Sequence, residues 1–359
     1  MMKKLLGILL FFNVLFFVLP GWAETQRYSD IYTDSFDTVI SFIAFSDSPE
    51  EFAKTNAEVH ALFQYLHKLY DRYNSYEDEG IVNVFTLNEK AAVEPVKVDP
   101  LLFSLLSFSK SHYETARGRT NIAMGRMLGI WHKYREHGLS KPEEATLPPM
   151  EDLRAAAAHQ DIDQLILNAE EMTVFFADPE MQLDVGAVAK GYATELVAMM
   201  LKNTDIHSYI ISAGGNVRLG DAPLDGRPNW GVGVQAPDGE VFSGSEIAET
   251  LYLSNCSVVT SGDYQRYYEV DGVRYSHLIN PDTLMPGNAF RSVTVITADS
   301  GYADILSTAA FLMPYEESRA FIESLPDVEA IWLFADGSEE MTEGIRSAAK
   351  SAGATNRKK

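Results

Sequence analysis

Residues 184–192 (DVGAVAKGY) place a carboxylate, Asp184, and an ammonium group, Lys190, on either side of a glycine. This stretch follows the apolar residues 181–183 and precedes residues 193–201, whose apolar side chains recur at helical spacing. We therefore expect a short strand, a glycine turn and a helix. The N-terminus of a helix points free backbone N–H groups and a positive dipole end at one place, where phosphate or carboxylate binds. The alternative is a plain strand-to-helix connection with Lys190 in solvent.

Asp304 and Thr308 stand four positions apart in residues 301–313 (GYADILSTAAFLM), which are rich in Ala and Leu and predict a helix. At this spacing both side-chain oxygens project from one face of the helix. A carboxylate, a hydroxyl and a backbone carbonyl are hard ligands that suit Mg²⁺ or Ca²⁺ rather than zinc. A structural interpretation stays open, because a first-turn Asp interacts with the helix dipole and Thr308 can bond back to the Asp304 carbonyl.

His277 is a third candidate, although a lone histidine in a segment such as YSHLINP is more often structural. The HExxH, P-loop and paired CxxC motifs are absent from the sequence. Residues 231–236 (GVGVQA) match a form of the dinucleotide-binding fingerprint, but Pro237 follows where a helix should begin. That fingerprint has meaning only between a strand and a helix, so we expect an ordinary alternating strand there.

Two helices are predicted from their start signals. Ser48 precedes Pro49 and a helix of about twenty residues with apolar positions three and four apart. Asp99 precedes Pro100 in the same way. Residues 71–88 predict a loop followed by a short strand. Single strands are expected at residues 32–45, 230–236, 251–259, 264–270, 273–278 and 292–297, and residues 209–220 predict a buried strand that ends in two glycines.

The order of these elements favours an α+β fold with antiparallel sheets over a doubly wound fold. Strands and helices do not alternate one by one, and several strands join by short turns, among them a hairpin signal at Asp271-Gly272. Residues 141–150 (KPEEATLPPM) resemble a linker, but we interpret them as a surface loop within one domain. The basic, small-residue segment 347–359 is expected to be disordered.

The composition limits the partners and the compartment. A formal net charge of −22 argues against nucleic acid and anionic lipid surfaces as partners, so an anionic ligand needs local donors or a metal. Cys256 is the single cysteine, which excludes an internal disulfide. Residues 1–23 have the pattern of a secretory signal peptide, with Lys3 and Lys4 before a short apolar run. We expect an exported, periplasmic or extracytoplasmic protein, with membrane contact only through an acceptor or an uncleaved N-terminal segment.

Five segments in order together resemble the ApbE family, the FAD:protein FMN transferases. DVGAVAKGYA is similar to the family's D-[LV]-[GS]-x-[IV]-[AG]-x-G-Y-A signature, and SAGGNVRLG is similar to its glycine-pair turn. TSGDYQRYY resembles its T-S-G-x-Y-x-x-Y segment, SHLINP resembles its S-H-[VIL]-[IL]-[DN]-P segment, and ADILSTA resembles its metal-binding helix. The resemblance implies an ApbE-like, T-fold-like single catalytic domain over residues 24–346, with antiparallel sheets and flanking helices.

The resemblance also implies a reaction. Such enzymes bind FAD, cleave its pyrophosphate with Mg²⁺, and attach FMN to a threonine, or sometimes serine, of a partner such as a respiratory electron-transfer subunit, releasing AMP. His277 matches the general base. The metal ligands are matched by Ala187, Asp304 and Thr308. Contacts to FAD are matched by Tyr76, Asp184, Lys190 and Ile279.

Two departures from the family pattern concern the flavin pocket. The family's M-G-T is Phe36-Asp37-Thr38 here, and its A-[ML]-D is Arg119-Thr120-Asn121, which we still expect to contact FAD. Residues 351–355 (SAGAT) resemble part of an acceptor site, but Ala349 replaces the acidic residue expected six positions before the threonine. Two other functions stay open: Mg²⁺-dependent hydrolysis of FAD to FMN and AMP, and non-enzymatic flavin binding.

Overall fold

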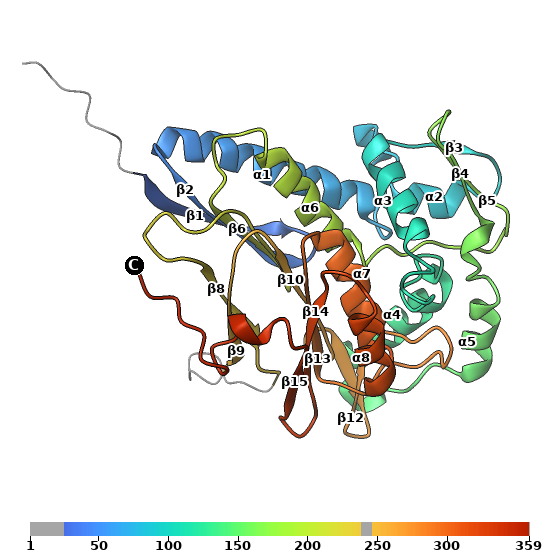
Figure 1. Cartoon of the computed structure of the whole chain (residues 1–359). Coiled ribbons are helices and arrows are strands. Elements are labelled where there is room, and N and C mark those ends of the chain that lie inside the picture. Colours follow the sequence, from blue (N-terminus) through green and yellow to red (C-terminus); the bar gives the residue numbers. More distant parts are fainter. Residues whose placement is uncertain (1–24, 238–245, 359) are drawn as a thin grey trace, which may run out of the picture.

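The computed structural model describes residues 25–237 and 246–358 (Figure 1). The predicted signal peptide, residues 1–23, lies outside the described residues. In the part of the chain that is described, every helix is too short or insufficiently apolar to cross a lipid bilayer.

A single antiparallel sheet forms the centre of the fold, as the sequence predicts. Each pair of neighbouring strands in it runs antiparallel. The strands that the structure describes in this sheet are, in spatial order, β1 (Gln26–Ser35), β2 (Thr38–Ser46), β6 (Tyr209–Ala213), β7 (Asn216–Leu219), β10 (Ser257–Gly262), β13 (Ser292–Thr297), β14 (Glu329–Leu333) and β15 (Glu339–Met341).

Helices cover one face of this sheet and a hairpin covers the other. Helix α1 (Pro49–Tyr70) and helix α6 (Ala189–Leu201) lie side by side over the first strands, and α7 (Ser300–Phe311) continues the layer over β10 and β13 (Figure 1). Helix α8 (Tyr315–Glu323) packs on β14. The opposite face buries Trp230 and its apolar neighbours from β8 (Trp230–Gln235), which pairs with β9 (Ile247–Leu253).

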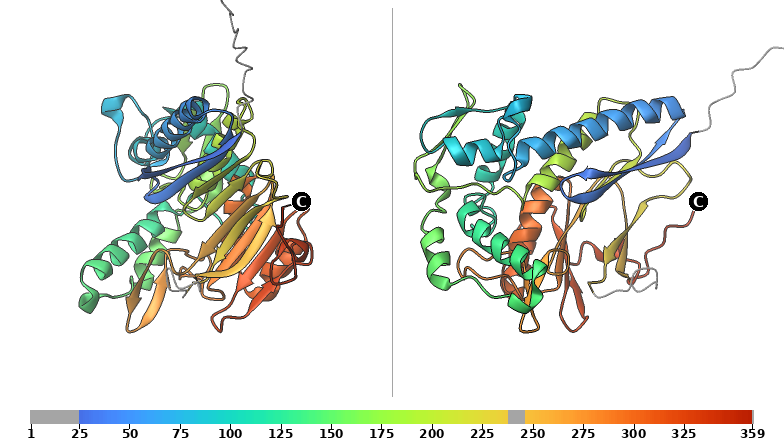
Figure 2. Two further views of the ribbon diagram at one scale, coloured as in Figure 1. Left: turned by 90° about the vertical axis from the view of Figure 1, so that its left-hand side faces the viewer. Right: turned by 180° about the vertical axis from the view of Figure 1, so that it is seen from behind.

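A smaller helical part lies beside the sheet and contributes one wall of the site. Its long element is α4 (Gly125–Ser140), which contacts α5 and the hairpin β11–β12 (Figure 2). The remaining elements are α2 (Val84–Lys90), α3 (Pro100–Ser111), α5 (Met150–Ala157), β3 (Val96–Lys97), β4 (Leu165–Asn168), β5 (Thr173–Phe176), β11 (Tyr267–Val270), β12 (Val273–Ser276) and the 3-10 turns Glu77–Glu79, Pro142–Glu144, Ile162–Gln164 and Arg346–Ala348.

The predicted helix starts are confirmed. The Ser48 side chain accepts a hydrogen bond from the Glu51 N–H at the start of α1, and the Asp99 side chain accepts one from the Leu101 N–H at the start of α3. Each cap satisfies a backbone donor that has no partner within the helix. The hairpin at Asp271-Gly272 is also confirmed, with φ values of 51° and 76° in its turn.

Two predicted single strands are wrong, because each contains a turn. Residues 32–45 form β1 and β2 around Phe36 and Asp37, whose φ values are 57° and 49°, and residues 251–259 break between β9 and β10. The strand expected to end in a glycine pair is confirmed as β6, which is followed by Gly214-Gly215 and then β7. The turn at Phe36 lacks the Asn-Gly or Asp-Gly pair that usually indicates a tight hairpin, so the pattern does not show it.

Two other predictions of local structure are corrected. The short strand expected within residues 71–88 is helix α2, because Asn83 accepts hydrogen bonds from the Thr86 N–H and hydroxyl and so caps it. Residues 347–358 are packed rather than disordered. Ala349 is buried and bridges to Leu251 of β9, and the Asn356 amide donates to the Asn229 carbonyl at 2.8 Å.

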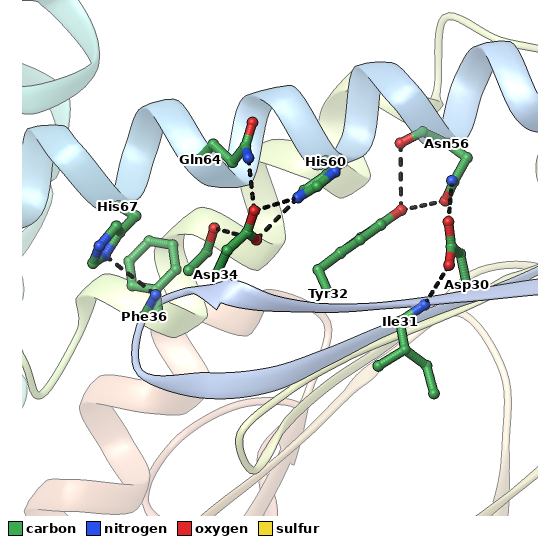
Figure 3. A network of polar contacts seen from close by, with 10 residues as sticks. Asp30, Ile31, Tyr32, Asp34, Phe36, Asn56, His60, Gln64 and His67 are labelled. Carbon is green, nitrogen blue, oxygen red and sulfur yellow. Dashed lines mark hydrogen bonds and ion pairs between the residues drawn. The ribbon is translucent and has the colours of Figure 1, made fainter.

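A polar network attaches α1 to β1 next to the turn at Phe36 (Figure 3). His60 of α1 bonds the Asp34 carboxylate at 2.9 Å and stacks on Tyr32. About two turns further along α1, the Nδ1 of His67 accepts a hydrogen bond from the Phe36 N–H. Both histidines are therefore structural, and they hold the turn at Phe36 and Asp37 beside the candidate site.

Candidate active site

A cavity of about 600 Å³ lies where the sheet, α6, α7 and the α4 part of the molecule meet. Pockets of this size hold small ligands and cofactors. It collects most of the predicted site residues from segments far apart in the sequence. The predicted residues that line it are Arg119, Thr120, Asn121, Asp184, Ala187, Lys190, His277, Ile279, Asp304 and Thr308.

The helix α6 begins earlier than its apolar pattern predicts. The strand expected at residues 181–183 is reduced to an isolated bridge between Met124 and Gln182, and the helix starts at Ala189. Lys190 therefore lies in the first helical turn, half-buried at the cavity. Its Nζ makes no hydrogen bond or ion pair with any residue that the structure describes. An ammonium group held this way is available to an anionic ligand.

Asp184 has a partner that the sequence does not indicate. Its Oδ2 accepts from the Arg72 guanidinium at 2.8 Å, and the same Arg72 nitrogen donates to the Gly125 carbonyl at 2.9 Å. The Oδ1 of Asp184 accepts from the Gly186 N–H at 2.8 Å. The carboxylate thus holds the turn before α6 at the cavity wall, and this ion pair joins segments 112 residues apart.

Asp304 is a buried carboxylate in α7 that faces the start of α6. Its Oδ2 accepts from the Gly191 N–H at 2.8 Å, while Oδ1 accepts no hydrogen bond from the described residues. Burial raises the pKa of the Asp304 carboxyl, and the nearby Lys190 charge and the Gly191 N–H oppose this rise. A buried carboxylate oxygen without a donor is a suitable ligand for a hard cation.

Thr308 lies one helical turn after Asp304, as predicted, and its hydroxyl is 3.2 Å from the Ser261 hydroxyl. The back-bond to the Asp304 carbonyl that the sequence allows for Thr308 comes from Ser307 instead, at 3.1 Å. The Thr308 oxygen therefore stays at the cavity beside Asp304. Within the described residues, His, Cys, Asp and Glu do not gather in groups of three or more that could hold a metal. A cation here would depend on one carboxylate, a hydroxyl and backbone oxygens.

The close approach of α6 to α7 depends on Gly191. A Cβ at this position would lie 2.4 Å from the Ser300 carbonyl oxygen and 2.4 Å from the Asp304 Cβ. No side chain fits in that space, so glycine allows the two helices to approach until the Gly191 N–H reaches the carboxylate. About one turn further along α6, the Glu195 carboxylate accepts hydrogen bonds from the Ser300 N–H at the start of α7 and from Arg218, each at 3.0 Å. These bonds fix a second point of the interface between the two helices.

His277 follows β12 and is held in one tautomer. Its Nδ1 lies 3.1 Å from the Arg266 carbonyl oxygen, which can only accept, so Nδ1 carries the hydrogen and Nε2 is left as the acceptor. Burial, together with the charges of Lys190, Arg266 and Arg135, lowers the pKa of His277 to about 3. The imidazole is therefore neutral at physiological pH and able to take a proton through Nε2.

The Arg119-Thr120-Asn121 segment lines the cavity but uses its side chains largely for its own attachment. Arg119 pairs with Asp282, and the Thr120 hydroxyl donates to the Ile305 carbonyl at 2.8 Å. The Asn121 amide donates to the Gln160 carbonyl at 2.8 Å, and its Oδ1 accepts from the Ala123 N–H. The Thr120 bond attaches this segment to α7, and the Arg119 and Asn121 bonds attach it to the segments around Asp282 and Gln160.

Tyr76 does not line the cavity, contrary to the prediction. Its hydroxyl donates to Asp71 at 3.2 Å and Lys68 lies over its ring, so the side chain is held away from the site. Tyr73, the other tyrosine nearby, lines the cavity instead. The two tyrosines are three residues apart, and a loop has no regular period from which the sequence could tell which one faces inward.

Sequence reasoning also missed one face of α4 and two arginines. Leu128, Trp131, His132 and Arg135 follow helical spacing on a single face and all line the cavity, as does Arg266. The sequence shows the helical spacing of these residues, but it does not show which part of the molecule this face of α4 contacts. With Lys190 and Arg119, these arginines surround the cavity with cationic groups in a chain whose formal net charge is −22. These cationic groups provide local attraction for an anion, beside the carboxylates of Asp37, Asp184 and Asp304.

Comparisons with known proteins agree with this geometry. The profile of the ApbE family matches residues 36–332. This chain belongs to the ApbE family. The FAD:protein FMN transferase of Treponema pallidum is 32% identical over 307 residues, which are 80% of this chain and 81% of that protein. The FAD:protein FMN transferase of Klebsiella pneumoniae is 33% identical over 275 residues, 74% of this chain and 81% of that protein.

Solved ApbE structures share the fold. The ApbE protein of Thermotoga maritima superimposes with a TM-score of 0.77 at 25% identity, over 90% of this chain and 99% of that chain. The flavin transferase ApbE of Vibrio cholerae gives a TM-score of 0.74 at 22% identity, over 90% of this chain and 100% of that chain. The ApbE-like α+β architecture expected from the sequence is confirmed.

Replacing Gly191 with alanine should separate α6 from α7. We expect Gly191→Ala to lower the free energy of unfolding by about 1–3 kcal/mol, because the new Cβ meets backbone and Asp304. Gly129→Ala is the matched control, since a Cβ at that helical glycine meets only the Arg72 side chain at 3.5 Å. It should raise stability by about 0.5–1 kcal/mol. Urea denaturation measures both, and equal effects of the two substitutions would contradict the close approach.

Proposed function

We propose that this chain is an FAD:protein FMN transferase that uses Mg²⁺ to move FMN from FAD to a threonine, or serine, hydroxyl of a partner protein, with release of AMP. The observation that carries this proposal is the meeting of Lys190, Asp304 with Thr308, and neutral His277 in one cavity. These supply a cation for phosphate, a hard-cation site and a base. The named relatives act as FAD:protein FMN transferases, which fixes the reaction class.

The cationic lining supports a pyrophosphate substrate. Phosphoryl transfer depends mostly on positioning and on neutralising the charge of the transferring group. Lys190 provides a positive charge that has no competing partner among the described side chains. Arg135 adds a second positive charge, although its guanidinium also lies 3.9 Å from the Glu136 carboxylate. Groups preorganised in a site that excludes water stabilise developing charge more strongly than the same groups in water.

The donor set supports Mg²⁺, with Ca²⁺ as a second candidate. Asp304 Oδ1, the Thr308 hydroxyl and a backbone oxygen near Ala187 would hold the ion, since all three residues line the cavity. When bound, such an ion polarises phosphoryl oxygens and offsets their charge. It would also offset the cost of burying the Asp304 carboxylate.

His277 acts as the base in this proposal. The acceptor hydroxyl oxygen forms a new bond to the FMN phosphorus, and the bond from that phosphorus to the bridging oxygen breaks. AMP leaves with the electron pair, and the hydroxyl proton passes to His277 Nε2. The imidazole enters this step neutral because burial and the nearby cations lower the pKa of His277, and the Arg266 carbonyl keeps the hydrogen on Nδ1.

The family resemblance and the signal-peptide pattern support an acceptor and a compartment. We infer an acceptor such as an electron-transfer subunit of a respiratory complex, modified at the periplasmic or extracytoplasmic side of the membrane. The signal-peptide pattern of residues 1–23 supports this location.

One mass-spectrometric experiment tests the proposed reaction. The protein is incubated with FAD, Mg²⁺ and a peptide that carries a threonine with an acidic residue six positions before it. We expect the peptide to gain the mass of FMN while AMP is released. Equal release of AMP and free FMN with and without peptide would indicate an FAD pyrophosphatase. FAD that stays intact would indicate a flavin-binding protein, and either result overturns the proposed transfer.

Removing the base should affect transfer and spare binding. We expect His277→Ala to slow FMN transfer by roughly 100- to 10,000-fold, the usual contribution of a positioned base. FAD affinity, measured by flavin fluorescence, should stay close to that of the wild type. His207→Ala, at an exposed histidine outside the cavity, is the control and should transfer normally. Wild-type transfer by His277→Ala would remove His277 from the mechanism.

Thermal unfolding tests the cation site without an activity assay. Mg²⁺ should raise the melting temperature of the wild type, because a ligand that binds only the folded state stabilises it. Asp304→Asn should abolish this rise. In metal-free buffer at neutral pH it should be at least as stable as the wild type, because the ionised Asp304 is unfavourably buried and the amide oxygen can still accept from Gly191.

The control for the cation site is Asp327→Asn, at an exposed carboxylate away from the cavity. This variant should keep the whole Mg²⁺-dependent shift. If Asp304→Asn keeps the shift as well, the ion binds elsewhere and Asp304 is not its ligand.

A further inference from the structure

A second hollow of about 780 Å³ opens beside the cavity, between the C-terminal half of α4 and strand β11. It shares Tyr73, Arg135, Arg266 and several neighbours with the cavity, so the two are continuous. We call it the α4–β11 groove. The residues that line the groove and not the cavity are Glu136, Gly138, Leu139, Pro142, Tyr267 and Glu269.

The groove carries apolar side chains that the fold leaves uncovered. Leu139 near the end of α4 is 58% exposed, and Tyr73 at the junction with the cavity is 52% exposed. Isolated exposed apolar residues are ordinary. Here the two flank one continuous path from the surface to the candidate active site, together with Pro142 and Tyr267. An extended chain with an apolar side chain could bury both of them.

The groove is connected through the backbone to the proposed base. The Arg266 carbonyl accepts the Nδ1–H of His277 at 3.1 Å and also its backbone N–H at 3.0 Å. The same residue lines both the groove and the cavity. A hydroxyl that enters through the groove therefore arrives at the side of the cavity where His277 is fixed.

The two ends of the groove carry opposite charges. At the junction, Arg266 is exposed and its guanidinium contacts only the Phe36 and Asp37 carbonyls, at 3.5 and 3.4 Å, within the described part of the chain. The outer end carries the carboxylates Glu136 and Glu269. These carboxylates disfavour a phosphate group in the outer groove, which argues that FAD occupies the cavity and that a different ligand occupies the groove.

We propose that the α4–β11 groove binds an extended segment of the acceptor protein and delivers its hydroxyl to the junction beside Arg266. This inference rests on the proposed transferase function. The segment would place an apolar side chain against Leu139 and Tyr267. An acidic side chain at the outer end would be disfavoured by Glu136 and Glu269.

The substitution Leu139→Glu tests this proposal because Leu139 is exposed and lies outside the cavity. The rate of FMN transfer is measured against the concentration of the threonine peptide described above, and FAD affinity is measured by flavin fluorescence. We expect Leu139→Glu to raise the KM for the peptide about tenfold or more, as truncation of an interface anchor commonly does. FAD affinity and the slow release of AMP without peptide should not change.

Leu224→Glu is the matched control, since Leu224 is 60% exposed and lines neither the cavity nor the groove. It should leave every measured quantity at the wild-type value. Lysine substitutions along the peptide sharpen the test. Lysine at the position that contacts residue 139 should lower the peptide KM of Leu139→Glu, and it should not lower the peptide KM of Leu224→Glu or of the wild type.

Each other outcome overturns the proposal in a distinguishable way. An unchanged peptide KM for Leu139→Glu shows that the acceptor docks elsewhere. A loss of FAD affinity shows that the groove holds part of the nucleotide. A dimer that Leu139→Glu converts to a monomer in sedimentation shows that the groove holds a second copy of the chain. If the wild type itself transfers no FMN, the transferase function fails first, and this is seen without any variant.

Discussion

The buried Asp304 carboxylate lies at the contact between α6 and α7, and the rest of the site depends on how closely these helices approach. Gly191 permits the approach, and its N–H then reaches the carboxylate at 2.8 Å. Desolvating a charge is costly unless donors or a cation compensate. Here one donor and the nearby Lys190 compensate in part, which leaves one oxygen facing the cavity for a ligand. The interface that gives the fold its helical layer is therefore also the interface that creates the cation site.

A second constraint is electrostatic. A chain with a formal net charge of −22 repels an anionic substrate at long range, so attraction has to be local. The cavity meets this need by collecting Lys190, Arg119, Arg135 and Arg266 from separate segments. Burial and the charges of Lys190, Arg266 and Arg135 also keep His277 neutral, because they lower its pKa. Binding of phosphate and readiness of the base thus come from one arrangement of cations.

Much of the fold was predictable where a short segment carries its own signal. The caps at Ser48 and Asp99 and the turn at Asp271-Gly272 need only neighbouring residues, and all three are confirmed. The hairpin at Phe36 and the helix α2 were missed. The turn at Phe36 depends on His67 of α1, which lies outside the hairpin. The cap of α2 is the Asn83–Thr86 contact within residues 71–88, and the Asn83 amide is in turn bonded to the Lys68 and Asn74 carbonyls.

For the site, the sequence by itself determined which chemical groups are present and which of them share a local element. Asp304 and Thr308 had to lie on one helical face, and Lys190 had to lie near the start of α6. Only the tertiary structure decided which groups meet. It pairs Arg72 with Asp184 across 112 residues, turns Tyr73 rather than Tyr76 toward the cavity, and holds the His277 tautomer through the Arg266 carbonyl. The physical reason is that spacing constrains neighbours along one element, whereas contacts between elements depend on how the whole chain packs.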